Sequence, residues 1–350
     1  MLPYFFAWAV FAYNGLSILR RIPIHALLLP GIFLTLFIGL RDRVGGDWYA
    51  YVRYLDSAST STISEIFQSP EPGYGFLNWL AVSWGGGVHF VNTICSLIFS
   101  IGLIKFAHSQ PRPWLALTLA FPYLVTVVAM GYSRQSVAIG LEMIALLALQ
   151  RDRLLSFLGW MALAASFHRT VLVMLILPAS TLSGNLRFSQ LIRLGLLVGA
   201  AYGMYTSVIA PDLDYYVQGY LEAEYQSQGA LIRVVLCLLP ALVFLSQPSA
   251  FQLTAQVQRI WILISWLAVV AAIALATVAS STAVDRLALY LIPLQLFVGA
   301  RLPDTRLFGV NATQWTQLLI AFSLAVLLVW LLFATHAFAW LPYRNLLLPF

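Results

Sequence analysis

A succession of apolar runs, most of them close to 20 residues long, constrains the fold of this chain more than any other feature. A helix needs about 20 apolar residues to cross a bilayer, and in lipid its backbone polar groups must be satisfied within the segment. The runs therefore predict an all-α polytopic membrane protein, with residues 1–350 forming a single integral membrane domain. We expect about 12 transmembrane helices or half-helices, over residues 2–19, 24–40, 88–107, 114–131, 134–150, 154–166, 170–181, 191–210, 230–246, 259–281, 286–300 and 314–335.

The expected helix 170–181 is short for a full crossing and ends at Pro178. We interpret it and the preceding helix, 154–166, as half-helices or re-entrant segments that meet at His168, because membranes tolerate such breaks where they line a cavity. A further short helix is expected at the membrane surface over residues 73–84, just before a run of three glycines.

The composition excludes a soluble globular protein, because only 9% of the residues are charged, whereas soluble domains carry about 25%. The first apolar run ends in Arg20 and Arg21 and lacks a cleavage site of small residues, so it is expected to be a retained helix. The only cysteines, Cys95 and Cys237, lie inside apolar runs, which predicts neither a disulfide framework nor a thiolate metal site.

The distribution of charge between the two sets of loops predicts the orientation. One set carries 11 of the 19 lysines and arginines but only two of the 13 acidic residues. Cytoplasmic loops are enriched in Lys and Arg, so this set faces the cytoplasm and both termini face outward. The same rule explains most of the net charge of +6, and no nucleic-acid partner is expected. Residues 41–75 and 211–229 then form the two large outer loops.

The first outer loop opens with the segment from Arg41 to Tyr51, which is dense in charge and aromatic residues. Gly45 and Gly46 allow the backbone to turn sharply. Such a turn can bring Asp42 and Asp47 together, as base, orienting group or arginine partner. A solvated loop without function is the alternative interpretation.

The same loop ends in Glu71-Pro72-Gly73-Tyr74. A rigid Pro-Gly turn holds the carboxylate of Glu71 in place, and Tyr74 offers an aromatic face on which a sugar can stack. The alternative is that Glu71 only caps a helix.

Arginines on the outer side are unexpected from topology alone, and most lie at or just inside helix ends. A charge at the centre of a membrane helix costs about 2.5–3.5 kcal/mol, so such residues usually pair or serve a function. The planar guanidinium group suits bidentate contact with phosphate, as in a lipid pyrophosphate. Internal salt bridges with Asp42, Asp47, Glu71 and Asp285 are the alternative. The outer arginines are Arg41, Arg43, Arg53, Arg134, Arg169, Arg233, Arg286 and Arg344.

Two of these arginines lie in short polar motifs. Arg134-Gln135 opens a helix, whose N-terminus attracts anions through its free N–H groups; an ordinary interfacial anchor is the alternative. His168, beside Arg169, interrupts an apolar run and is a candidate acid, base or pyrophosphate donor. The alternative is a histidine that only satisfies the structure.

The remaining motifs are weaker. Arg286 follows Asp285, and Tyr290 lies on the same helix face as Arg286, four residues later. Arg344 follows an aromatic residue near the end of the chain. The loop 211–229 is rich in acidic and tyrosine residues, which makes it a candidate lid over a carbohydrate.

The order of these motifs resembles the EpsG family of Wzy-like polysaccharide polymerases over nearly the full chain. The matching elements are the Arg41–Tyr51 segment, the Glu71–Asn78 segment, Arg134-Gln135, Phe167-His168-Arg169 and the late Arg286–Tyr290 pair. At Arg169 the sequence departs from the family, which more often has a small or neutral residue there. The resemblance implies a GT-C-like helical bundle whose site lies in outer-face loops. It also implies polymerisation of undecaprenyl-pyrophosphate-linked oligosaccharides at the periplasmic face of a bacterial inner membrane.

In the expected reaction an acceptor sugar hydroxyl attacks, and undecaprenyl pyrophosphate leaves. Asp47 or Glu71 takes the hydroxyl proton, with Asp42 and His168 as further catalytic candidates. Arginines stabilise the pyrophosphate charge. The predicted substrate-binding residues are Arg41, Tyr51, Tyr74, Arg134, Gln135, Arg169, Arg233, Asp285, Arg286, Tyr290 and Arg344. No metal or other cofactor is expected. Besides the lipid bilayer, expected partners are a chain-length regulator and a flippase of the same pathway.

Two other functions stay open at this stage. A flippase or transporter of lipid-linked oligosaccharide needs a polar path through the membrane, where the spans offer little beyond Glu142. A glycan acyltransferase would want a histidine at membrane depth, whereas His168 is placed outward. A ligase that shares the donor is equally compatible with the sequence.

Overall fold

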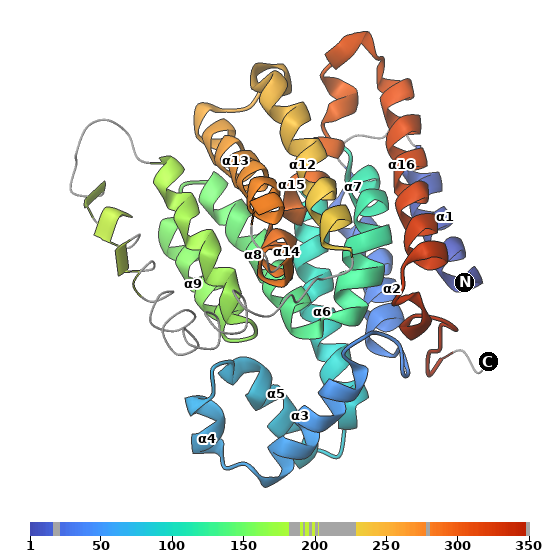
Figure 1. The fold of residues 1–350 in the computed structure, drawn as a ribbon, viewed down its shortest axis with the longest axis vertical. Coiled ribbons are helices and arrows are strands. Elements are labelled where there is room, and N and C mark those ends of the chain that lie inside the picture. The colour runs from blue at the N-terminus through green and yellow to red at the C-terminus, as the bar shows by residue number, and fades with distance from the viewer. Residues whose placement is uncertain are drawn as a thin grey trace.

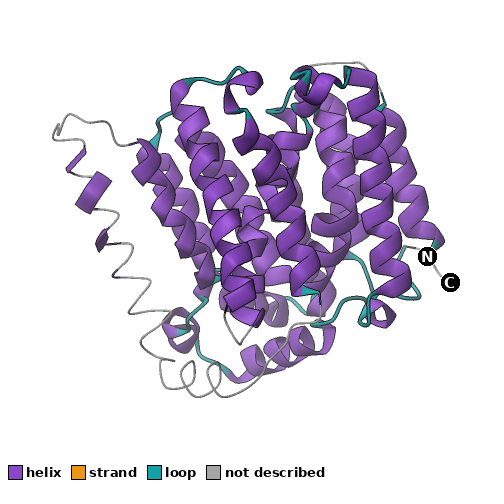
Figure 2. Cartoon of the chain, turned by 45° about the horizontal axis from the view of Figure 1, so that its top comes forward, coloured by secondary structure: helices purple, strands orange, loops and turns teal. Residues whose placement is uncertain are grey.

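The described part of the chain is helical and contains no strand (Figures 1 and 2). This computed structural model describes residues 1–16, 22–181, 229–277 and 281–347, with a few positions between 190 and 202. The expected helix at 191–210 lies largely outside the described residues, and the expected outer loop 211–229 lies outside them up to residue 228.

Most helices run side by side in one bundle (Figure 1). The bundle helices are α1 (Leu2–Gly15), α2 (Leu28–Gly39), α6 (Gly87–His108), α7 (Pro113–Ala120), α8 (Ser133–Gln150), α9 (Leu154–Ala165), α12 (Ala230–Ser246), α13 (Ala255–Thr277), α14 (Ser281–Ala288), α15 (Ile292–Gly299) and α16 (Ala312–Phe333). A π-helical stretch, Phe121–Ala129, follows α7, and a 3-10 helix, Arg169–Thr181, follows α9.

The bundle agrees with the predicted polytopic membrane protein. In the described part of the chain, three helices, α6, α13 and α16, are long and apolar enough to cross a membrane, and shorter apolar helices accompany them. Two predicted spans are less regular than expected. The span 114–131 changes from α to π geometry at Phe121, and the span 286–300 is broken by the 3-10 turn Leu289–Leu291. The expected break at His168 is present, because α9 ends at Ala165 and the next helix begins at Arg169.

Residues 41–75, the expected outer loop, contain two helices and the start of a third, which lie across one end of the bundle (Figure 1). They are α3 (Trp48–Thr60), α4 (Ile63–Gln68) and α5 (Pro72–Ser83). A capping box starts α4, since the Thr62 hydroxyl accepts from the Glu65 N–H and the Glu65 carboxylate from the Thr62 N–H. Pro72 starts α5 at a position where its missing N–H costs nothing. The predicted helix at 73–84 is thereby confirmed.

Helix α8 forms the centre of the bundle, since nearly all of its side chains are buried. It packs between α6 and α9, and its first residues reach the end that α3–α5 cover. We call this end the site end. At the opposite end, Arg112 pairs with Asp304 at 2.9 Å and Arg193 with Asp152 at 2.6 Å.

Candidate active site

Glu71 is the centre of a polar cluster at the site end. It occupies the N-cap position of α5, yet its side chain makes no capping hydrogen bond. Oε2 instead accepts from Arg134 Nη1 at 2.5 Å. Gly73 brings this turn close to the break after α9, because its N–H donates to the Ser166 carbonyl at 2.9 Å. A Cβ at Gly73 would lie 2.4 Å from Ser166 Oγ, so only glycine allows this approach.

A chain of side-chain contacts leads from Glu71 into the bundle. Glu71 Oε1 lies 3.8 Å from His168 Nδ1. Thr170 Oγ1 is 2.8 Å from the same nitrogen and 3.0 Å from the hydroxyl of Tyr290. The imidazole tautomer decides which of these groups donates and which accepts. In either tautomer the contact with Thr170 fixes the position of the imidazole relative to the Glu71 carboxylate.

Arg134 lies in the first turn of α8, where the sequence predicted an anion site. Its guanidinium carbon is 4.7 Å from the ring centroid of Tyr54 and 5.8 Å from that of Tyr74. Cation–π contact and the bond to Glu71 together hold the guanidinium group in place. The next residue, Gln135, donates to the backbone carbonyl of Arg286 at 2.8 Å and so joins α8 to α14.

A cavity of about 410 Å³ opens beside the Glu71–Arg134 pair. This volume falls within the range of about 300–1,000 Å³ that is usual for ligand sites. Its wall combines two carboxylates, two arginines, tyrosines and hydroxyl groups, a set suited to a sugar with an attached phosphate. The polar and aromatic lining residues are Tyr54, Ser57, Ser61, Glu65, Ser69, Glu71, Tyr74, Asn78, Arg134 and Arg169.

Burial changes the acidity of both candidate bases. Desolvation raises the pKa of the Glu71 carboxyl, while the charge of Arg134 opposes the rise. Desolvation also raises the pKa of Asp47, against the charges of Arg134 and Arg286 and a hydrogen bond from Tyr51. Asp47 immediately precedes α3 and shares Arg134 with Glu71, but of these two carboxylates only Glu71 lines the cavity.

The first motif begins with the expected turn, which Gly45 makes with a φ of 108°. Asp42 contacts α6, with its Oδ1 3.2 Å from Nε2 of His89. The side chain of Arg344 is exposed, and its carbonyl accepts from the Asp42 N–H at 3.0 Å.

The geometry favours a structural role for Arg41 over the predicted substrate contact. The side chain is fully buried and donates to four acceptors, which leaves little for a ligand. These acceptors are the carbonyls of Ile38 and Val44 and the side chains of Asn92 and Ser133.

Three other predicted residues also have protein partners. Arg233 and Asp285 form a buried ion pair between α12 and α14. For Arg233 the structure therefore supports the alternative interpretation, an internal salt bridge in place of contact with a phosphate. Tyr51 accepts from the Ser133 N–H at 2.7 Å and so supports the start of α8. The side chain of Arg286 is exposed near the cluster, and Arg169 lines the cavity.

Sequence reasoning missed Thr170 and one wall of the cavity. Thr170 follows the His168-Arg169 motif directly, so adjacency was its only signal. The wall residues Tyr54, Ala58 and Ser61 carried a clearer signal, because with Tyr51 they repeat at intervals of three, four and three. That spacing places them on one face of a helix.

No group of three or more His, Cys, Asp and Glu side chains that could hold a metal ion occurs in the part of the chain that the structure describes. A comparison with protein-family models matches residues 25–345 to the EpsG family, which covers nearly the whole chain. Comparisons with curated proteins and with solved structures give no match.

Proposed function

The chain belongs to the EpsG family of Wzy-like polysaccharide polymerases, and from this premise we propose that it joins lipid-linked oligosaccharide repeat units. The donor is an undecaprenyl-pyrophosphate-linked oligosaccharide, and the acceptor is a second such molecule. The Glu71–Arg134–His168 cluster on the wall of the 410 Å³ cavity is the observation that supports this proposal best.

In the proposed reaction the acceptor hydroxyl attacks the anomeric carbon of the donor sugar. A new glycosidic C–O bond forms, the bond from that carbon to the pyrophosphate oxygen breaks, and undecaprenyl pyrophosphate leaves. Glu71 takes the hydroxyl proton, because it is the buried carboxylate that lines the cavity. Asp47 is the second candidate for this role.

Charge on the leaving pyrophosphate is stabilised by Arg134 and Arg169, both on the cavity wall. Tyr54 and Tyr74 supply the aromatic faces for sugar rings. The arginines replace a divalent cation in this proposal, so the reaction is expected to be independent of metal ions.

The finer architecture belongs to the same proposal. We place the site end in the periplasm and the opposite end in the cytoplasm of a bacterial inner membrane, as the arginine and lysine distribution predicts. A GT-C-like bundle of about 12 spanning segments fits the helices and the remaining apolar run at 191–210. A chain-length regulator and a flippase are the proposed partners.

Deletion of the gene, followed by analysis of lipid-linked glycans, tests the function. Accumulation of single-repeat undecaprenyl oligosaccharide in the outer leaflet is the expected result. Complementation with wild type should restore the polymer, and complementation with Glu71→Gln should not. Accumulation on the cytoplasmic leaflet would instead identify a flippase and overturn the proposal.

A further inference from the structure

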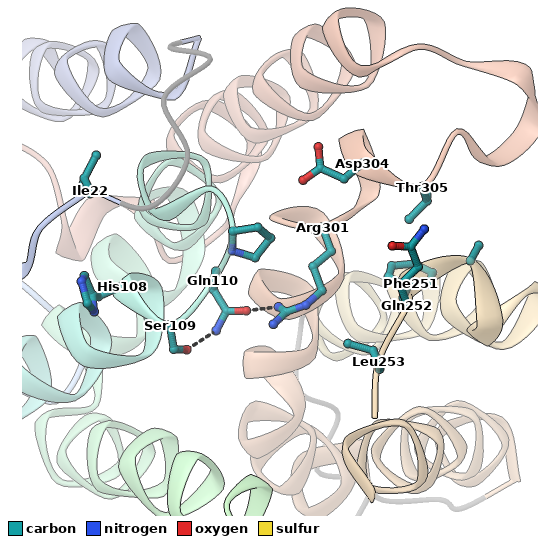
Figure 3. A pocket seen from close by; sticks show the side chains of 12 residues that line it. Ile22, His108, Ser109, Gln110, Phe251, Gln252, Leu253, Arg301, Asp304 and Thr305 are labelled. Carbon is teal, nitrogen blue, oxygen red and sulfur yellow. Dashed lines mark hydrogen bonds between the residues drawn. The ribbon is translucent and has the colours of Figure 1, made fainter. Parts of the chain in front are cut away.

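A second cavity, of about 620 Å³, lies at the end of the bundle opposite the candidate active site, beside the Arg112–Asp304 pair. Figure 3 shows its lining residues. Four segments form the cavity: Ile22 between α1 and α2, the end of α6 with the turn after it, the turn between α12 and α13, and the turn after α15. Its polar lining residues are His108, Ser109, Gln110, Gln252, Arg301, Asp304 and Thr305. Catalysis as proposed above makes no use of this cavity.

Arg301 is the central cation of this cavity, and its protein partners are neutral. In Figure 3 its side chain extends toward Gln110, whose Oε1 accepts from Nη1. The same Nη1 donates to the carbonyl of Phe297 at 3.3 Å, and the guanidinium carbon lies 3.8 Å from the centroid of the Phe297 ring. Among the described residues, none accepts a hydrogen bond from Nε or Nη2, so half of the planar fork is unused.

The acid that lines the same cavity serves a different arginine. Asp304 Oδ1 accepts from Arg112 at 2.9 Å. Burial lowers the pKa of Arg301 to about 9, and no described carboxylate opposes that shift. The guanidinium group therefore stays charged at pH 7 without a counterion among the described residues.

Topology alone does not account for a partly buried arginine here. The orientation of a membrane protein depends on an excess of Lys and Arg in its cytoplasmic loops, and exposed side chains at this end already supply that excess. Those exposed side chains are Lys105, Arg151, Arg153, Arg259 and Arg306. A guanidinium that gives up water for an amide, a carbonyl and an aromatic ring points instead to a ligand.

We propose that this cavity binds a phosphate-bearing ligand through Arg301, from the face that the charge distribution predicts to be cytoplasmic. The free edge of the guanidinium fork matches two phosphate oxygens. The exposed side-chain amide of Gln252 offers a further donor on the wall, and the volume suits a ligand larger than inorganic phosphate. The same chemistry occurs in the headgroup of an anionic phospholipid and in soluble phosphate compounds.

Binding by the purified full chain in lipid nanodiscs tests the proposal. One arm titrates inorganic pyrophosphate onto protein in phosphatidylcholine nanodiscs, with sodium chloride at matched ionic strength as the reference. The other arm replaces part of the phosphatidylcholine by phosphatidylglycerol and adds no pyrophosphate. A saturable rise in Tm is expected in at least one arm; a rise only with pyrophosphate identifies a soluble ligand, and a rise only with phosphatidylglycerol identifies a lipid headgroup.

Three substitutions locate the binding site. Arg301→Gln and Gln252→Glu should each weaken binding by at least about tenfold, because one removes the cation and the other puts a carboxylate on the wall. Gln252 has an exposed side chain without a hydrogen bond among the described residues, so Gln252→Glu tests the site even if Arg301→Gln fails to fold. Gln247→Glu, in the same turn but outside the cavity, is the matched control and should bind like wild type. Absence of a saturable shift in both arms, or unchanged affinity in Gln252→Glu, would overturn the proposal.

Discussion

Replacement of Glu71 by glutamine separates the chemistry of the candidate site from its structure. Glutamine keeps the shape of the side chain and one acceptor oxygen for Arg134, but it cannot take a proton. A general base contributes about 10²–10⁴ to a rate, so polymerisation by Glu71→Gln should fall by about that factor.

The expected cost to stability is much smaller than the loss of activity. The side chains of Glu71 and Arg134 are 15% and 27% exposed, so water screens the pair in part. A hydrogen bond to a charged group contributes about 1.5–3 kcal/mol and one to a neutral group about 1 kcal/mol. The substitution should therefore cost about 1–2 kcal/mol, and Tm should fall by only a few degrees.

The assay measures polymer length and rate with purified protein and a lipid-linked repeat unit, alongside thermal unfolding of the same sample. Glu65→Gln is the matched control, because Glu65 lines the same cavity while its carboxylate caps α4. It should lower Tm only slightly and leave the rate within a few-fold of wild type. If Glu71→Gln polymerises at a rate close to that of its control, Glu71 is not the base.

The pH dependence gives a second readout of the same residue. A base must be ionised, so the rate should rise as pH increases through the pKa of Glu71. Burial raises that pKa, which moves the acidic limb of the profile above the ordinary glutamate value of about 4.3. If the acidic limb of the pH–rate profile is the same in Glu71→Gln as in wild type, the limb belongs to another group, and Asp47 is the next residue to test.

Four further predictions follow from the same geometry. Thr170→Val breaks the contacts of His168 Nδ1 and Tyr290, so the rate should fall at least about tenfold while Thr170→Ser keeps most of it; equal rates for the two variants would remove Thr170 as a positioning residue. Gly73→Ala places a Cβ against Ser166 and should destabilise by about 1–3 kcal/mol, whereas Gly159→Ala, in open space on α9, should not lower Tm. Asp285→Asn leaves Arg233 without its buried anion and should cost about 3–5 kcal/mol in thermal unfolding, while Arg43→Ala, at an exposed pair, should change Tm little. Polymerisation should persist in EDTA, and a loss that magnesium restores would contradict the metal-independent mechanism.

Local patterns predicted the helices well, because the need to satisfy backbone groups in lipid leaves few other structures. The first outer segment was predicted as a loop because its polar composition hid the helical spacing of Tyr51, Tyr54, Ala58 and Ser61. An interfacial helix needs only one apolar face, which a search for continuous apolar runs does not detect.

The role of Arg41 could not be predicted, because it depends on residues that are far away in the sequence. Its acceptors include Asn92 on α6 and Ser133 at the start of α8. The chain end also lies against it, through a bridge to Asn345. Sequence identifies an arginine at a helix end, but only the tertiary arrangement shows whether its donors face a ligand or the protein. Glu71, Arg134 and His168 were predicted as separate motifs, and their direct contact likewise required the fold.

Each principal residue of the candidate site lies at a helix end or break. Glu71 precedes α5, Arg134 is in the first turn of α8, His168 lies between two short helices, and Tyr290 is in the 3-10 turn between α14 and α15. A helix end leaves backbone groups unsatisfied, which lipid does not tolerate unless protein or a cavity surrounds them. Here the protein itself supplies partners for the ends. The Ser166 carbonyl after α9 accepts from the Gly73 N–H of α5, and the Ser133 N–H at the start of α8 donates to the Tyr51 hydroxyl. The helix breaks and the candidate site therefore have a common origin, because the contacts that satisfy these ends also bring Glu71, Arg134 and His168 together.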